Sequence, residues 1–115
     1  MEIWKDITKI PRFTYNGGFI YNWIDFTGKG YQISSNGRLR NVDKLILSNA
    51  KKHHGYIVNN LTDVTGKPKT IQRHLLVLAT FKLDSYTEGA TPFHLDFNKT
   101  NNSIENLIWE KKETN

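Results

Sequence analysis

The sequence predicts an α+β fold made of short antiparallel hairpins and one or two short helices. Two Asn-Gly pairs, at residues 16–17 and 36–37, each lie between β-branched and aromatic residues, a pattern typical of hairpins with tight turns. A third observation is helical, because Leu75, Leu78 and Ala79 have the spacing of one helix face. At 115 residues, the chain has the length of one domain with one core.

The first half of the chain is expected to consist mostly of hairpins. Residues 1–10 alternate loosely between apolar and polar side chains and predict a short strand or turn that Pro11 ends. The next hairpin covers residues 13–26, with its turn at Asn16-Gly17-Gly18. A further turn at residues 28–30 precedes the second hairpin, which surrounds the later Asn-Gly pair.

The second half is expected to add one more hairpin and a helix. Segments 55–61 and 69–72 are rich in β-prone residues and flank a loop that contains Gly66 and Pro68. A helix then runs from about Arg73 to Phe81. No repeat, low-complexity segment or linker divides the chain, so we expect a single domain.

Charge is unevenly distributed along the chain, whose net formal charge is +5. Residues 1–83 contain 13 Lys and Arg against 5 Asp and Glu, a net +8, whereas residues 84–115 contain 3 against 6, a net −3. A nuclease could use such a distribution, with cations for phosphates and carboxylates for metal. A basic soluble domain with a solvated acidic tail explains the same numbers.

Composition also bounds the chemistry and the compartment. Cysteine is absent, which excludes disulfides and thiolate zinc sites. No apolar run approaches the roughly 20 residues that cross a bilayer. Residues 1–10 lack the apolar core of a signal peptide. We therefore expect a cytoplasmic protein with no membrane partner.

Three separated stretches of the sequence resemble one family, in the family's order. "EIWKDI" and "YQISSNGRLRN" are similar to the N-terminal module of HNH homing endonucleases. "GYIVNNL" with "GKPKTIQRHLLVLATF" resembles the family's next segment, and "HLDFNKTNNSIENLIW" resembles its His-Asn motif. The resemblance implies one HNH-endonuclease-like domain: an N-terminal module in residues 1–50, with an insertion at residues 8–30, and an HNH-like region in residues 51–115.

The resemblance also implies a ββα-metal motif with a catalytic histidine and a divalent ion. His94 matches the general base, a role that a neutral imidazole can fill near neutral pH. Asn106 matches the Asn that braces the histidine loop. An active enzyme would use Mg²⁺ or Mn²⁺ with oxygen ligands, for which Asp96 and Asn115 are the candidates. Asp96 has a second interpretation, in which it shapes the turn by hydrogen bonds to backbone groups.

Three features depart from the family's motif. Phe93 precedes His94 where active relatives place Asp or Asn, and a phenyl ring offers no oxygen to a metal ion. Phe97 replaces the turn glycine, which predicts strain if this position has a positive φ. Six residues follow Trp109, too few for a stable helix. The final helix of the motif is therefore expected to be missing or truncated, with Asn115 at the chain end.

A group of cationic side chains is the candidate DNA-binding surface, and a solvated cationic surface is the alternative interpretation. The hairpin over residues 55–73 could lay a two-stranded ribbon into a major groove, with contacts mainly to phosphates. The candidate residues for these contacts are Arg38, Arg40, Lys51, Lys52, Lys67, Lys69 and Arg73.

The insertion at residues 8–30 is the candidate surface for a protein partner. It is rich in Tyr, Phe and Trp, and aromatic residues are common in interface hot spots. Tyr15, Tyr21 and Trp23 are the candidate contacts, and packing onto the core is the alternative. Outside the insertion, His74 lies in an apolar run and is expected in the core.

Three functions are open at this point. The chain could be a phage or mobile-element protein in a bacterial host cell that binds DNA or a nuclease complex, with cleavage weak or lost. It could be an active, metal-dependent homing endonuclease that nicks DNA. It could also be an anti-defence inhibitor, anti-CRISPR or anti-restriction, that binds a host nuclease or CRISPR effector protein. The sequence leaves the oligomeric state open.

Overall fold

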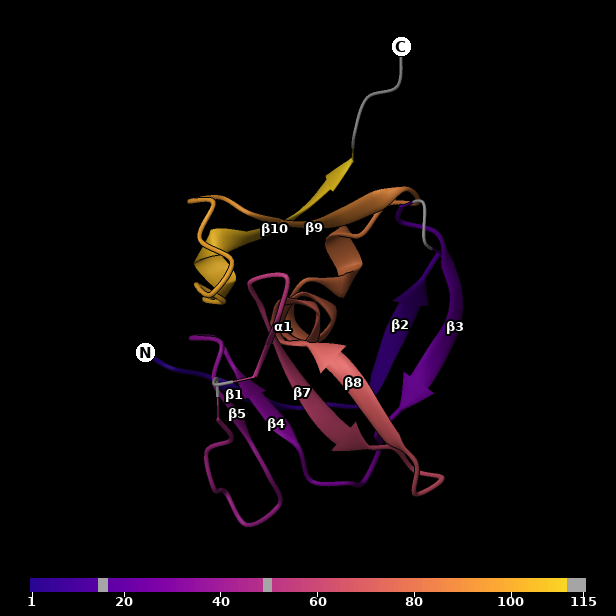
Figure 1. Cartoon of the computed structure of the whole chain (residues 1–115), viewed down its shortest axis with the longest axis vertical. Coiled ribbons are helices and arrows are strands. Elements are labelled where there is room, and N and C mark those ends of the chain that lie inside the picture. Colours follow the sequence, from indigo (N-terminus) through magenta and orange to yellow (C-terminus); the bar gives the residue numbers. More distant parts are fainter. Residues whose placement is uncertain (15–16, 49–50, 112–115) are drawn as a thin grey trace.

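The structure is a computed structural model that describes residues 1–14, 17–48 and 51–111. These residues form four small antiparallel sheets around one α-helix (Figure 1). The first sheet has the strand order β1-β4-β5, and the second pairs β2 with β3. The bounds of these strands are β1 Trp4–Asp6, β2 Lys9–Phe13, β3 Ile20–Asp25, β4 Gln32–Ser34 and β5 Leu39–Arg40.

The other two sheets come from the second half of the chain. One has the order β6-β7-β8, and the other pairs β9 with β10. Their strands are β6 Lys52–His53, β7 Tyr56–Thr62, β8 Pro68–Gln72, β9 Ala90–His94 and β10 Leu107–Lys111. The helical elements are α1 Arg73–Phe81 and the short 3₁₀ helices η1 Leu83–Ser85 and η2 Ile104–Asn106.

The predicted α+β architecture is confirmed. The helix expected from Arg73 to Phe81 is α1. The later Asn-Gly pair lies in the turn between β4 and β5, where Ile33 is paired with Leu39. The third expected hairpin is formed by β7 and β8, with Leu61 opposite Lys69.

The first hairpin differs from its prediction in two ways. Pro11 does not end a strand but lies inside β2, opposite Trp23 of β3. Proline is tolerated there because, among the described residues, β2 pairs with β3 alone. The connection is also longer than a two-residue turn, since Thr14 N donates to Phe19 O over 2.9 Å. Asn16 lies outside the described residues.

The core surrounds α1, which Figure 1 shows near the centre with the β9–β10 and β7–β8 pairs on opposite sides. Leu76 and Leu78 of α1 are fully buried. Ile33 of β4 and Leu107 of β10 belong to the same apolar cluster. Burial of each such side chain contributes about 1.5–3 kcal/mol, so one helix holds together sheets from both halves of the chain. No helix among the described residues is long and apolar enough to span a membrane.

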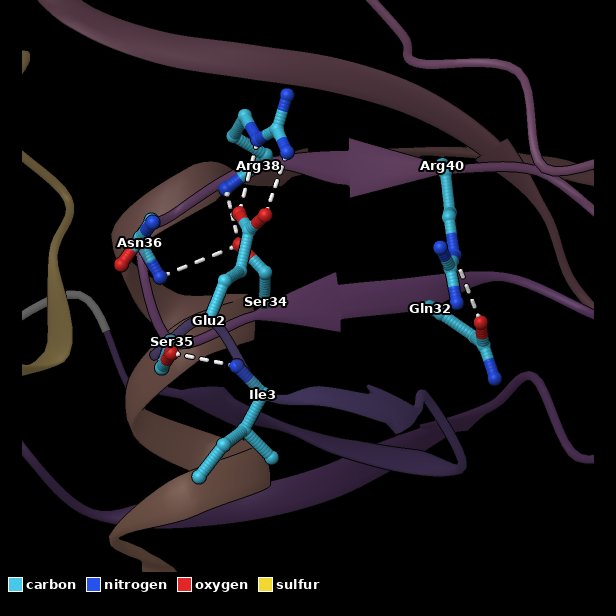
Figure 2. A network of polar contacts seen from close by, with 8 residues as sticks. All are labelled: Glu2, Ile3, Gln32, Ser34, Ser35, Asn36, Arg38 and Arg40. Atoms are coloured by element: carbon cyan, nitrogen blue, oxygen red, sulfur yellow. Dashed lines mark hydrogen bonds and ion pairs between the residues drawn. The ribbon is translucent and has the colours of Figure 1, made fainter.

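Residues in and next to the turn between β4 and β5 bind the first residues of the chain through a hydrogen bond and an ion pair (Figure 2). Ile3 N donates to Ser35 Oγ over 2.9 Å, and Arg38 binds the carboxylate of Glu2 with two of its nitrogens. The hydrogen bond from Arg38 is the main reason why the pKa of Glu2 is lowered to about 2. The N-terminal segment and the hairpin therefore form one unit.

Arg73, the first residue of α1, is fully buried, and its expected role as a DNA contact is wrong. Its guanidinium donates to Gly37 O over 2.9 Å, to Asn59 Oδ1 over 2.7 and 2.9 Å, and to Ser48 O over 3.2 Å. Burial lowers its pKa to about 10, so the group stays cationic near pH 7. These acceptors come from separate segments, and Arg73 joins them inside the fold, where a phosphate cannot reach it.

Candidate functional site

The hairpin of β9 and β10 carries the candidate site, with His94 as the last residue of β9, opposite Leu107. The side chain of His94 is buried, and its Nε2 lies 2.8 Å from Asn102 Oδ1. Because an amide oxygen only accepts, this contact favours a proton on Nε2 and a lone pair on Nδ1. A neutral imidazole in this tautomer has the electronic form that a general base requires.

Two rings, one from β7 and one from α1, pack on His94. The ring centroid of His74 lies 5.1 Å from that of His94, and the centroid of Tyr56 lies 5.8 Å from it. His74 is buried, as the sequence predicted. Burial first, and then the nearby His94, lower the pKa of His74 to about 3. His74 is therefore neutral near pH 7.

The buried cluster around His94 contains two polar atoms without hydrogen-bond partners among the described residues. These atoms are Nδ1 of His74 and Nδ2 of Asn102. Buried polar groups are usually paired, so these two nitrogens are exceptions within the core. Sequence reasoning missed the contact of Asn102 with His94, which brings together residues eight positions apart.

Asn106 and Asp96 brace the loop that follows His94. Asn106 Oδ1 accepts from Asp96 N over 3.0 Å, and Asn106 Nδ2 donates to Asp96 Oδ1 and to Asn101 O, both over 2.9 Å. Asp96 also accepts from Asn98 N and from the Asn101 side chain, each over 2.8 Å. Asp96 thus has the turn-shaping geometry of its second interpretation, and Asn106 braces the loop through its hydrogen bonds to Asp96 and Asn101.

An aromatic pair includes Phe93, the position at which the resemblance implies an oxygen ligand to a metal ion. The rings of Phe93 and Phe97 meet edge to face, with centroids 5.5 Å apart. Phe97 has φ 60°, a conformation that is strained for a bulky residue, and its side chain is 80% exposed. Both Asp96 oxygens accept hydrogen bonds from the turn. The described residues contain no group of three His, Asp or Glu side chains that could hold a metal together. A phenyl ring at position 93 offers no oxygen, and the Asp96 oxygens are already engaged, so this donor set fits a divalent ion poorly.

The turn between β4 and β5 contacts the loop after His94 directly. Ile104 N donates to Ser35 O over 2.8 Å. Gly37 has φ 81°, and a Cβ on it would lie 2.5 Å from Asn102 O, closer than a real Cβ approaches an oxygen. Only glycine allows the two backbones to approach so closely. The turn that carries Gly37 thus packs on the residue whose side chain holds His94.

The remaining cationic candidates divide into paired and exposed groups. Arg38 is engaged by Glu2, and Arg40 lies 3.9 Å from the Trp4 ring centroid while it donates to Gln32 Oε1 over 2.8 Å (Figure 2). Lysines of β6, β8 and the preceding segments are exposed or half-buried: Lys51, Lys52, Lys67 and Lys69. These four are better placed than the arginines to meet a phosphate.

Two further cations escaped the sequence reasoning. Lys99 donates to His54 O over 3.1 Å and lies 4.7 Å from the Tyr56 ring centroid, so it links the histidine loop to the β6–β7 turn. Arg12 is exposed on β2 and lines the same surface groove as Lys52. No local pattern marks either residue, because each acquires its neighbours only from the tertiary fold.

Two of the three aromatic candidates for a protein contact are exposed at the surface. Tyr21 is 61% exposed and Trp23 is 43% exposed, both on β3. Such exposure leaves their rings available to a ligand or partner. Tyr15 and Asn115 lie outside the described residues.

Comparison with solved structures finds one similar chain, described as "DNA binding and cleavage by the HNH homing endonuclease I-HmuI". The TM-score is 0.64 and the sequence identity 34%, over 79% of this chain and 53% of the other. The protein has an HNH-like fold. It spans about half the length of that endonuclease. No family model matches the sequence, and the search of curated proteins gave no significant match.

We predict that Asp96→Asn lowers stability near neutral pH but not in acid. Hydrogen bonds from Asn101, Asn98 and Asn106 hold the pKa of Asp96 below its ordinary value. Its contribution is therefore present above about pH 4 and is lost as the pH falls through the lower folded pKa. Thermal unfolding of both proteins, followed by circular dichroism from about pH 7 to about pH 2, should show two curves that converge in acid.

The matched control is Glu105→Gln, which removes an exposed carboxylate from the same loop. It should leave the pH dependence unchanged. An Asp96→Asn deficit of equal size in acid and at neutral pH would contradict the stabilising role of the charge.

Proposed function

We propose that this protein binds DNA through its HNH-like scaffold and that cleavage is weak or lost. The observation that carries the proposal is the retention of the buried His94 beside the aromatic pair Phe93 and Phe97. The scaffold is similar to that of a homing endonuclease described as binding and cleaving DNA. Residues 1–115 would act as one domain, with β2 and β3 as an insertion in the N-terminal module.

The DNA-binding part of the proposal is supported by the position of the lysines. Lys67 and Lys69 lie on or beside the β7–β8 hairpin, and Lys51 and Lys52 lie at β6, in the same three-stranded sheet. A two-stranded ribbon with cations along it can enter a major groove. Contacts of lysine with phosphates give affinity without sequence specificity.

The loss of cleavage is supported by the shortage of oxygen atoms near His94 that could bind a metal ion. HNH nucleases typically use a divalent metal ion, and Mg²⁺ or Mn²⁺ needs oxygen ligands. Phe93 supplies a ring instead of an oxygen, and the oxygens of Asp96 already accept hydrogen bonds from the turn. His94 could still accept a proton, but a general base alone does not stabilise the charge that develops on the leaving oxygen.

One observation favours a second function, the binding of a protein. Phe97, Tyr21 and Trp23 are large, exposed aromatic side chains, a residue type that is common in interface hot spots. In this second function the protein would be an anti-defence inhibitor, and its partner would be a host nuclease or CRISPR effector protein. The two functions differ in their dependence on salt, because DNA binding releases counterions from phosphates.

We predict strongly salt-dependent DNA binding. With about six phosphate contacts, affinity for duplex DNA should fall on the order of a thousandfold between about 50 and 200 mM salt. The double variant Lys67→Gln/Lys69→Gln should reduce the slope of log affinity against log salt by about 2. Fluorescence anisotropy with a labelled duplex measures both. The double variant Lys9→Gln/Lys111→Gln, which removes the same charge from other sheets, should leave the slope unchanged.

Undetectable DNA binding at low salt would end this proposal. If a purified nuclease were bound under the same conditions, the inhibitor function would replace it.

We also predict that purified protein does not nick supercoiled plasmid in Mg²⁺ or Mn²⁺ faster than the variant His94→Ala does. The physical reason is the missing oxygen donor at Phe93. Conversion of supercoiled to open-circular plasmid on an agarose gel measures the rate. Metal-dependent nicking that His94→Ala abolishes would show an active homing endonuclease instead.

A further inference from the structure

A surface groove lies between the β2–β3 hairpin and the sheet of β6, β7 and β8. Its volume is about 550 Å³, within the range of roughly 300–1,000 Å³ that is usual for ligand sites. Apolar side chains of β3, β7, β8 and α1 line it: Ile24, Val58, Ile71 and Leu75. The hairpin of the insertion thus adds the second wall of a hollow that the sheet alone would not enclose.

The charge of the groove selects its ligand. Arg12, Lys51, Lys52 and His53 line it, and no Asp or Glu does so among the described residues. Such a cluster attracts an anion. A second hollow of about 320 Å³ shares Arg12 and Ile24 with the first and reaches Lys67 and Lys69, although two carboxylates also line it. Cations therefore continue from one hollow to the next.

The aromatic and apolar lining narrows the ligand further. Tyr21 lines the groove and is 61% exposed, so its ring is open to stacking. A ligand that is anionic and also presents flat apolar faces satisfies both features. Unpaired nucleotides have this chemistry, since their bases expose π faces that stack on aromatic side chains. In a duplex those faces are covered by neighbouring base pairs.

We propose that this groove binds a single-stranded segment of nucleic acid. Phosphates meet Arg12 and Lys52, and a base lies over the apolar floor against Tyr21. The inference rests on the proposed DNA-binding function and extends it from duplex to unpaired strand. The insertion would then contribute a nucleic-acid site of its own, separate from the histidine loop.

The test compares a labelled oligo(dT) of about 12 nucleotides, within the usual site size, with a duplex of similar length. Tyr21→Ser should weaken binding of the single strand about fivefold or more, because stacking on an aromatic side chain contributes at least that factor per base. Tyr21→Trp should retain binding. Arg12→Gln should weaken it, and Lys9→Gln, on the same strand but outside the groove, should not.

Three outcomes separate this inference from the proposed function. Loss of single-strand binding in Tyr21→Ser, with duplex binding and thermal stability unchanged, supports the groove. Duplex binding by the wild type without single-strand binding, or equal single-strand affinity of Tyr21→Ser and wild type, overturns the inference and leaves the proposed function in place. Binding of neither DNA at low salt overturns both.

Discussion

The buried guanidinium of Arg73 is the interaction on which the arrangement of the site depends. A cation removed from water is tolerable only when its donors are satisfied, and here the acceptors come from the β4–β5 turn, from β7 and from the segment after β5. The next residue, His74, packs on His94. The same guanidinium therefore joins the N-terminal module to the second half of the chain and fixes the start of the helix beside the histidine.

The contacts that shape the loop after His94 differ from those that would bind a metal ion. The loop after His94 is shaped by Asp96, Asn102 and Asn106, and the close approach of Gly37 seats the loop on the N-terminal module. None of these contacts requires a metal ion. An aromatic residue at position 93 can therefore remove an oxygen donor while the fold persists. Under the proposed function, that separation would let an HNH-like protein keep the shape of a nuclease while it acts by binding.

Local sequence patterns correctly predicted those helices and hairpins whose formation depends mainly on neighbouring residues. The α1 bounds and the β4–β5 hairpin follow from periodicity and turn chemistry. Pro11 was misread because its tolerance depends on whether a strand has a second neighbour, which is a property of the sheet. Arg73 was misread because a run of basic residues does not reveal which side chain meets buried acceptors. The contact of Asn102 with His94 was likewise invisible until the loop was folded.

The central claim is that the side chains around His94 cannot hold a divalent ion. Anomalous diffraction from crystals of the protein soaked in manganese tests this claim most directly, because it locates the ion without relying on activity. We expect no ordered manganese beside the imidazole of His94. An ordered ion at that position, coordinated by protein oxygens, would contradict the account.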